Sequence, residues 1–372
     1  MILVLTQAFP PETGGIQILM GGLAGALAAA GHRVLVIADA TRGDRSFEDG
    51  LKGTLVRRFG GPRPLRRRVK AWAARRVLAR GDVDAVFCDS WKSIELVAPP
   101  RVPVAVLAHG AEYPAQISSR KRRRIARALA KSGSVIANSR YTASLVRPYL
   151  SGDTGLQIVA PPIAPQPEPS RAALDRLAGV TGGGRPLLAG LARLEPRKGF
   201  DRIIEALPGL ARRWPAIKLV IGGTGRDAAR LEALARRLGV ADRLHLLGRA
   251  DADMKAALLS SADLFVMPTR REGNSVEGYG IAYAEAAWYG VPSLAGSEGG
   301  GGDVVSDGET GRVVPGDNLE SVEAATRELL ADDNRRRAMG AKARARIRRT
   351  GTWESALPRY LERERLGRQK GP

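Results

Sequence analysis

The first 38 residues, MILVLTQAFPPETGGIQILMGGLAGALAAAGHRVLVIA, decide the fold class. They contain an apolar run at 2–7, a Gly-rich turn, an apolar helical stretch at 16–30 and a second apolar run at 34–38. Short runs that are apolar without alternation are typical of strands buried on both faces. Gly31 directly follows the helical stretch, where a glycine commonly ends a helix. The segment therefore predicts a strand, a helix and a second, parallel strand.

The same alternation continues along the chain and restarts once. In the first half, further strands are predicted at 84–88, 103–108 and 134–137, and helices at about 65–80 and 118–132. The second half repeats the pattern, with strands at 186–192, 217–222, 243–247, 263–267 and 291–295 and helices at about 200–213, 226–238, 252–261, 280–289 and 318–332. Alternating strands and helices predict one parallel sheet in each half, covered by helices on both faces.

A proline-rich segment separates the halves. The stretch APPIAPQPEPS, 160–170, has five prolines in eleven residues and can form neither a helix nor a central strand. We predict a first domain over 1–160, a linker over 161–170, a second domain over 171–350 and a C-terminal helix within 351–372. The predicted fold class is α/β, with two Rossmann-like doubly wound domains that face each other across a ligand-binding cleft.

The composition is strongly basic. The 372 residues carry 59 Lys and Arg against 38 Asp and Glu, a formal net charge of +21. Such a charge favours anionic partners such as nucleic acid, acidic lipid surfaces or phosphorylated substrates. A generally Arg-, Ala- and Gly-rich composition is the alternative explanation.

The one cysteine, Cys88 in the run AVFCD, is interpreted as a buried, inert thiol. With one cysteine, no internal disulfide is expected, and a reducing compartment fits.

The start of the chain does not resemble a secretory signal, because MILVLTQ lacks a basic segment and is typical of a strand. The most apolar stretch, 16–30, is too short to span a bilayer. We therefore expect a cytoplasmic protein that is soluble or peripheral to a membrane.

The turn after the first strand ends in Gly14 and Gly15, immediately before the predicted helix. Adjacent glycines let a ligand approach the backbone closely, and the free amides at a helix start attract an anion. The turn therefore predicts a phosphate contact. A plain tight turn is the alternative interpretation.

A cationic loop follows the first strand of the second half. In GLARLEPRKG, 190–199, Arg193 and Lys198 lie five positions apart. The loop is predicted at the carboxyl end of a parallel strand, where ligands of such sheets bind. Arg can bind phosphate oxygens in pairs and Lys acts as a point charge, so the two residues are suited to a diphosphate. A solvated basic loop is the alternative.

The strongest signal is RREGNSVEGYGIAYAEAAWYG, 270–290. Glu277 and Glu285 are eight positions apart, with Gly278 and Gly280 between them and an apolar helix predicted after the turn. The turn offers backbone amides to a phosphate or the adjoining sugar. Glu277 can accept hydrogen bonds from sugar hydroxyls, and Glu285, one turn into the helix, can bind both hydroxyls of a ribose. Paired carboxylates also suggest glycoside hydrolysis, but the cationic loops nearby favour binding of an anion. A surface helix with two unrelated glutamates is the remaining alternative.

The order of these motifs resembles family 4 of the retaining glycosyltransferases, which have the GT-B fold. The resemblance rests on the strand before GLARLEPRKG, on Glu277 with Glu285, and on the YGVPSLAG that follows. It covers nearly the whole chain and looks closest to the phosphatidylinositol mannosyltransferase branch. It implies a catalytic set of Arg193, Lys198, His109 and Glu277, and a donor-binding set of Gly14, Gly15, Arg249, Gly278, Tyr279, Gly280, Ile281 and Glu285.

The family pattern gives these residues their roles. Arg193 and Lys198 would hold the diphosphate, Glu285 the ribose and Glu277 the transferred sugar. His109, in the segment HGAEY, would contact the sugar near its 6-hydroxyl. Arg249 would lie where the base is held by backbone contacts, and the turn 278–281 would line the sugar and β-phosphate.

Two further features concern the end of the chain and one loop. The resemblance implies that the C-terminal helix, in SALPRYLERERL at 355–366, crosses back to pack on the first domain. The glycine run 299–302 has one glycine more than the family pattern, and no role is assigned to it.

No metal or cofactor is predicted. Asp82-Val-Asp84 and Asp251-Ala-Asp253 have the Asp-x-Asp pattern that holds Mg²⁺ in many transferases. The first enters a predicted strand, and the second is predicted to cap the helix at 252–261. Three histidines and one cysteine offer no transition-metal cluster. The cationic loop and the helix-start amides are expected to stabilise the leaving diphosphate instead.

Two basic stretches of the first half are candidates for contact with an anionic membrane surface. In the first, 62–81, Leu65, Val69, Trp72 and Ala73 share a helical face while the basic residues point largely elsewhere, as in interfacial helices. The second is SRKRRRIARALAKSG, 119–133. Each is alternatively a solvated helix that packs by its apolar stripe. The family resemblance implies that the first domain receives the acceptor, so a lipid-linked or glycan acceptor fits.

Together these observations predict a metal-independent, retaining hexosyltransferase that uses a GDP- or UDP-sugar and is peripheral at the inner face of the plasma membrane. The alternatives are a GT-B nucleotide-sugar epimerase, a non-catalytic sugar-nucleotide binder and a basic nucleic-acid-binding protein. Only 5% aromatic residues and the lack of a recognised motif argue against nucleic acid as a partner. The complete set of site residues argues against a non-catalytic binder.

Overall fold

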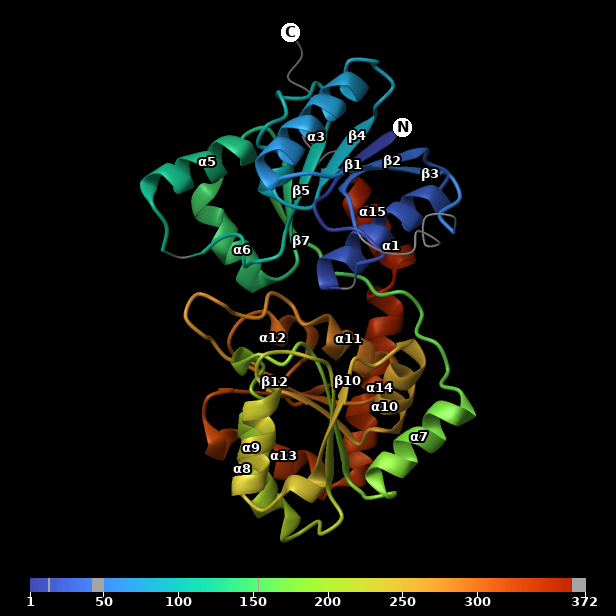
Figure 1. Ribbon diagram of the computed structural model, residues 1–372, viewed down its shortest axis with the longest axis vertical. Coiled ribbons are helices and arrows are strands. Elements are labelled where there is room, and N and C mark those ends of the chain that lie inside the picture. Colours follow the sequence, from blue (N-terminus) through green and yellow to red (C-terminus); the bar gives the residue numbers. More distant parts are fainter. Residues whose placement is uncertain (13, 42–49, 115, 153, 363–372) are drawn as a thin grey trace. The chain divides into compact units, whose positions relative to one another are not determined.

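The computed structural model describes residues 1–12, 14–41, 50–114, 116–152 and 154–362 (Figure 1). The chain divides into two compact units. The first comprises Met1–Ala164 with the segment from Thr352 onward, and the second comprises Pro165–Gly351. Each unit has its own parallel sheet and its own helices on both sheet faces.

The first unit has a sheet whose described strands follow the order β3-β2-β1-β4-β5-β6-β7, with all neighbours parallel. The strands are β1 Ile2–Leu5, β2 Val34–Asp39, β3 Thr54–Phe59, β4 Ala85–Cys88, β5 Val104–Ala108, β6 Ser134–Ala137 and β7 Gly155–Ile158. The helices are α1 Gly15–Ala29, α3 Arg63–Leu78, α4 Trp91–Ile94, α5 Ser119–Leu129, α6 Arg140–Val146, the 3-10 turn Arg147–Tyr149, and α15 Trp353–Leu361.

Both faces of this sheet are buried, which explains why its central strands are apolar throughout. On β1, Leu3 and Leu5 lie in the core formed with α3, α4 and α5, whereas Ile2 and Val4 lie in the core formed with α1 and α15. Cys88 is fully buried in the first of these cores, and burial raises the pKa of its thiol. The interpretation of Cys88 as an inert core residue agrees with this placement.

The C-terminal helix belongs to the first unit. Thr352 and Ser355 form a capping box at the start of α15, and the helix lies beside α1 (Figure 1). Gly22 of α1 makes this approach possible, because a Cβ added there would lie 2.3 Å from Trp353 Nε1. Residues 363–366 of the predicted helix lie outside the described residues.

The second unit has a sheet with the described strands in the order β10-β9-β8-β11-β12-β13, again with all neighbours parallel. The strands are β8 Leu187–Leu191, β9 Lys218–Gly222, β10 Leu244–Gly248, β11 Leu264–Met267, β12 Ser293–Gly296 and β13 Gly311–Val314. The helices are α7 Arg171–Thr181, the 3-10 turn Pro196–Lys198, α8 Phe200–Ala211, α9 Ala228–Arg237, the 3-10 turn Ala241–Arg243, α10 Ala252–Ser261, α11 Ile281–Trp288, α12 Gly301–Val304, α13 Leu319–Ala331 and α14 Asp333–Thr350.

The predicted fold class is confirmed, because each unit is a doubly wound parallel sheet of the Rossmann type and the last helix returns to the first unit. Three strands that the sequence analysis did not predict, β3, β7 and β13, are sheet edges. The helices α4, α6, α7, α12 and α14 were also not predicted. Among the described residues, the structure has no helix that is both long and apolar enough to cross a membrane.

Candidate active site

Two loops of the second unit meet where the strand order of its sheet reverses, between β8 and β11. Ligands of doubly wound sheets bind at the carboxyl ends of the strands at this point. Gly199, after β8, has a φ of +75°, and a Cβ added there would lie 2.0 Å from the carbonyl oxygen of Pro268, after β11. Glycine tolerates both the positive φ and the close approach of the Pro268 carbonyl oxygen, so the backbones of the two loops can pack against each other. The Arg270 N–H also donates to the carbonyl oxygen of Arg197 at 2.9 Å.

Arg197 and Lys198 converge on one carboxylate. Both are nearly buried, and both lie in the 3-10 turn after β8. Arg197 Nη1 lies 2.9 Å from Glu277 Oε2, and Lys198 Nζ is ion-paired with the same oxygen. Burial alone would raise the pKa of Glu277, but the charges of Lys198 and Arg197 outweigh burial and lower that pKa to about 2. Glu277 is therefore ionised at neutral pH, and its Oε1 lies outside these two contacts.

Arg193 joins the same cluster through Glu195. Arg193 Nη1 lies 2.7 Å from Glu195 Oε1, and Arg197 Nε lies 2.8 Å from Glu195 Oε2. The Arg193 side chain is 74% exposed, so its guanidinium can turn toward a ligand. The structure thus brings the predicted residues Arg193, Lys198 and Glu277 together. It adds Glu195 and Arg197, which the sequence analysis missed although both lie inside the quoted loop.

The turn from Gly278 to Gly280 leads into α11. Gly280 has a φ of +91°, and a Cβ added there would lie 2.5 Å from the ring of Tyr283. The side chain of Tyr279 is buried, and burial raises the pKa of its phenol. Tyr279 therefore offers a ligand its backbone rather than its hydroxyl. Ile281 is the first residue of α11, so its amide belongs to the unpaired amides of the helix start.

The glycine run 299–302 packs against this turn. Gly300 N–H donates to the carbonyl oxygen of Glu277 at 2.9 Å. A Cβ added at Gly300 would lie 2.1 Å from the carbonyl oxygen of Gly278, and one at Gly299 would lie 2.3 Å from that of Glu277. Glycines at these positions let the loop after β12 hold the Glu277 turn in place.

Glu285 lies one turn into α11 and is buried. Lys255 of α10 lies with its Nζ 2.6 Å from Glu285 Oε1. The ion pair compensates the buried charge of Glu285 and fixes the direction of its carboxylate. The sequence analysis missed Lys255, because no spacing rule connects two residues that lie 30 positions apart on different helices.

Arg249 lies at the same edge of the sheet, farther from the reversal point. It directly follows β10, and β9 separates β10 from β8. Because all these strands are parallel, Arg249 lies at their carboxyl ends together with the cationic loop. Its side chain is exposed. Its role in holding the base stays a prediction.

The site residues predicted in the first domain also follow strands. Gly14 is the N-cap of α1, which begins at Gly15. His109 follows β5, and its backbone N–H donates to Glu112 Oε1 at 2.7 Å. His109 Nε2 lies 2.9 Å from the carbonyl oxygen of Asp89, which can only accept, so this nitrogen carries a proton. Nδ1 of the neutral ring is then the acceptor available to a ligand. The roles of these residues stay predictions.

Both Asp-x-Asp segments have structural partners. The Asp84 carboxylate pairs with the N-terminal amine at 2.5 Å. Asp251 caps α10, as predicted, and accepts from Met254 N–H at 2.7 Å. Asp253 accepts from the N–H and hydroxyl of Ser170 at 2.7 and 2.5 Å. Within the described ranges, no group of three or more His, Cys, Asp or Glu side chains is arranged to hold a metal ion.

Comparisons with known proteins cover both units. Residues 13–165 match the family model "Glycosyltransferase Family 4", and residues 178–346 match "Glycosyl transferases group 1". The GDP-mannose-dependent alpha-(1-6)-phosphatidylinositol monomannoside mannosyltransferase of Mycolicibacterium smegmatis is 32% identical over 375 residues, which cover 97% of each chain.

Two solved structures share the fold at low sequence identity. HepE from Anabaena, crystallised with UDP, has a TM-score of 0.79 at 19% identity, over 97% of this chain and 98% of that chain. Sucrose-phosphate synthase from Thermosynechococcus elongatus has a TM-score of 0.78 at 20% identity, over 98% of both chains. The mycobacterial relative is 32% identical along almost the whole chain, and the family models match both units. Together with the two parallel sheets, this shows that the chain belongs to the family 4 glycosyltransferases and has the GT-B fold.

Proposed function

We propose that this glycosyltransferase moves mannose from GDP-mannose to a phosphatidylinositol-based glycolipid, with retention of anomeric configuration and without a metal ion or other cofactor. The observation that carries the proposal is the cluster of Arg193, Arg197, Lys198 and Glu277 at the reversal point of the second sheet. The identities of donor and acceptor follow the name of the mycobacterial relative, whose alignment includes both units.

In this proposal Arg193 and Lys198 bind the diphosphate of the donor. Negative charge accumulates on the diphosphate as its bond to the sugar C1 breaks, and the fixed cations stabilise that charge. The acceptor hydroxyl attacks C1 from the face that the nucleotide leaves, and its proton passes to an oxygen of the departing phosphate. Glu277 accepts hydrogen bonds from sugar hydroxyls, Glu285 binds the ribose diol, and His109 lies near the 6-hydroxyl.

Binding of the donor requires Lys198 to exchange partners. Its ammonium is paired with Glu277 Oε2, an oxygen that Arg197 also contacts at 2.9 Å. When Lys198 turns to the diphosphate, Arg197 remains to keep Glu277 ionised and oriented. While no phosphate is bound, the ion pair with Glu277 thus compensates the buried charge of Lys198.

A transfer assay tests this function. GDP-mannose, GDP-glucose and UDP-glucose are each supplied with phosphatidylinositol or its monomannoside, and the anomeric configuration of the product is read by NMR. We expect an α-linked mannoside from GDP-mannose. A β-linked product would contradict retention. Turnover with UDP-glucose alone would contradict the proposed donor, and an epimerised donor without transfer would favour the epimerase.

Chelation is expected to leave the activity intact. The cationic cluster supplies positive charge at the diphosphate, so EDTA should change the initial rate by less than about twofold, whereas a metal-bound diphosphate would make the rate metal-dependent. The measurement is the initial rate with EDTA and with added Mg²⁺ or Mn²⁺. Complete loss with EDTA, restored by either ion, would contradict the proposal.

Contact with an anionic membrane at the cytoplasmic face is a further part of the proposal, and the two basic helices support it unequally. On α3, three residues of the predicted stripe, Leu65, Val69 and Trp72, are 58%, 36% and 55% exposed, because the helix packs through its other side. The fourth, Ala73, is partly buried and packs against the core of the first unit. On α5, the apolar residues Ile125 and Leu129 are buried, so this helix offers only charge. The proposal therefore assigns insertion to α3 and electrostatic attraction to both.

Replacing Leu65 and Trp72 together by serine is expected to weaken binding to vesicles of phosphatidylcholine and phosphatidylglycerol by about 10-fold or more, since two exposed apolar anchors are lost. Co-sedimentation at low and high salt is the measurement, and wild-type protein should be released at high salt. Leu319→Ser, at a 37% exposed apolar residue of α13, is the matched control. Lack of wild-type binding at low salt would remove the membrane claim and leave the transferase claim intact.

A further inference from the structure

An ion-pair network adjoins the loops that form the site cluster of the second unit. This Asp201 network consists of Asp201, Asp227, Arg230 and Arg270. Asp201 lies in the first turn of α8 and is buried. Arg270 Nη1 lies 2.7 Å from Asp201 Oδ1, and Arg270 Nη2 lies 2.7 Å from Oδ2. Two parallel contacts between a guanidinium and a carboxylate fix their relative orientation as well as their distance.

The bidentate pair connects the two loops that meet at the reversal point of the sheet. Asp201 follows Lys198 by three positions, and Arg270 precedes Glu277 by seven. The backbone bond from Arg270 N–H to the carbonyl oxygen of Arg197, at 2.9 Å, joins the same two loops. Burial alone would raise the pKa of Asp201, but the hydrogen bonds and charge of Arg270 outweigh burial and lower that pKa. Asp201 is therefore ionised at neutral pH, and the pair persists there.

The other two members of the network connect the loop after β9. Arg230, in α9, lies 3.3 Å from Asp201 Oδ2 and contacts both carboxylate oxygens of Asp227, at 2.5 and 2.8 Å. Asp227 is the N-cap of α9, and its backbone N–H donates to the carbonyl oxygen of Leu194 at 3.2 Å. A Cβ added at Gly225 would lie 2.2 Å from that same oxygen. Loops after three strands of the second sheet thus converge on one network of two carboxylates and two guanidinium groups.

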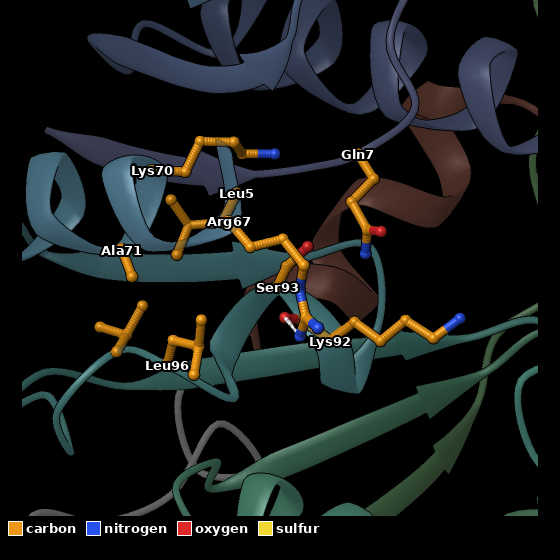
Figure 2. Close-up of a pocket in the computed structure, with 9 residues that line it drawn as sticks. Leu5, Gln7, Arg67, Lys70, Ala71, Lys92, Ser93 and Leu96 are labelled. Carbon is orange, nitrogen blue, oxygen red and sulfur yellow. Dashed lines mark hydrogen bonds between the residues drawn. The ribbon is translucent and has the colours of Figure 1, made fainter. Parts of the chain in front are cut away.

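An ion pair of the first unit provides a contrast, because it joins helices. Arg67 of α3 donates to Glu95, the C-cap of α4, at 2.6 Å, and to the carbonyl oxygen of Lys92 in α4 at 3.1 Å (Figure 2). Loss of this pair would affect how two helices of the first unit pack. Loss of the bidentate pair in the second unit would instead change the spacing of loops that carry site residues.

We propose that Asp201 and Arg270 are positioning residues for the transfer reaction. Their ion pair holds the loops after β8 and β11 at the spacing at which the cations of the first loop meet the Glu277 carboxylate. Neither residue needs to touch the donor for this role. A misplacement of reacting groups by about 1 Å can lower a rate by roughly 100-fold. The kinetic role of the pair rests on the proposed function, whereas the spacing of the loops does not.

Arg270→Lys is expected to lower kcat for transfer from GDP-mannose by about 10- to 100-fold. Lysine keeps a positive charge beside Asp201 but cannot make two parallel contacts, so the spacing of the loops is no longer fixed. KM for GDP-mannose should change less than kcat, because Glu285, which is proposed to bind the ribose, lies outside the network. Since the buried carboxylate keeps a cation, the variant is expected to fold, which circular dichroism checks.

Arg185→Lys is the matched control for the kinetic measurement. Arg185 precedes β8 and lies with its Nη1 3.0 Å from Oδ2 of Asp263, which precedes β11. This pair therefore joins the same two strands at their other ends, away from the site loops. We expect the kcat of the control to equal that of wild type. A kcat near the wild-type value in Arg270→Lys, or a loss confined to KM, would overturn the proposal.

Hydrogen exchange followed by mass spectrometry tests the spacing without turnover. In Arg270→Lys, amides of 193–199 and 270–277 should exchange about 10-fold faster than in wild type, because the loops lose a charge-assisted contact. Arg67→Lys, in the first unit, is the control and should leave these amides unchanged. Equal exchange in Arg270→Lys and wild type would overturn the proposal. Wild-type protein that transfers no mannose would contradict the proposed function alone, and exchange would then decide whether the pair sets the spacing.

Discussion

Replacing Lys198 by alanine is expected to lower kcat by about 100- to 1,000-fold, the usual cost of losing one preorganised group that stabilises developing negative charge. The ammonium is nearly buried beside Glu277, in the 3-10 turn that follows β8. In this variant Glu277 keeps its ion pair with Arg197, so the buried charge of the carboxylate remains compensated. The measurement is single-turnover transfer from GDP-mannose at saturating acceptor.

Lys342→Ala is the matched control for this variant. Lys342 is an exposed lysine of α14 in the same unit, so its loss removes the same charge without touching the cluster. We expect its kcat to equal that of wild type. A Lys198→Ala enzyme that turns over near the wild-type rate would contradict the role of the cationic loop in departure of the diphosphate.

Glu277→Gln is expected to destabilise the protein at neutral pH by roughly 3 to 5 kcal/mol, because it leaves the buried Lys198 ammonium without its carboxylate and Arg197 with Glu195 as its remaining partner. The pKa of Glu277 is lowered from 4.5 to about 2 in the folded protein. Its contribution to the free energy of unfolding is therefore complete above about pH 4.5 and is lost as the pH falls through about 2. The difference between variant and wild type should shrink over the same range.

Urea unfolding of both proteins at pH 7 and at successively lower pH measures this difference. Glu272→Gln is the control, since Glu272 lies in the same loop and pairs at 3.4 Å with an Arg226 side chain that is 75% exposed. An exposed pair of this kind contributes less than about 1 kcal/mol. A Glu277→Gln protein as stable as wild type at pH 7, or a difference that stays constant down to pH 2, would show that the ion pairs do not support the fold.

The periodicity of the sequence predicted the central strands and one edge strand, β10, and missed the edge strands β3, β7 and β13. Central strands such as β1 and β8 are buried on both faces and therefore read as unbroken apolar runs. The edge strand β3 alternates, with Arg57 exposed between less exposed neighbours, and β7 begins at a glycine. Edge strands satisfy half of their backbone groups outside the sheet and need no continuous apolar run, so their sequences resemble loops. The basic helix α14 was missed for a related reason, since most of its residues face solvent.

Within the candidate site, the sequence indicated residues that lie in loops directly after strands. It missed residues whose importance depends on a contact with a side chain from another segment. Arg193, Lys198 and Glu277 were predicted from their positions after strands, and they share one cluster. Lys255 was not predicted, because its importance arises only from contact with Glu285 on another helix. The glycine run 299–302 also had no explanation until its backbone contact with the Glu277 turn was seen. Contacts between distant segments require the folded backbone.

A crystal structure with bound GDP-mannose, or with a non-transferable analogue, tests the central claim most directly. The account predicts the diphosphate within hydrogen-bonding distance of Arg193 and Lys198, with the Lys198–Glu277 pair broken and the Arg197–Glu277 pair kept. It also predicts the ribose hydroxyls on Glu285 and no metal ion on the phosphates. A nucleotide bound away from the loops after β8 and β11, or a diphosphate held through a cation on aspartate side chains, would contradict the account.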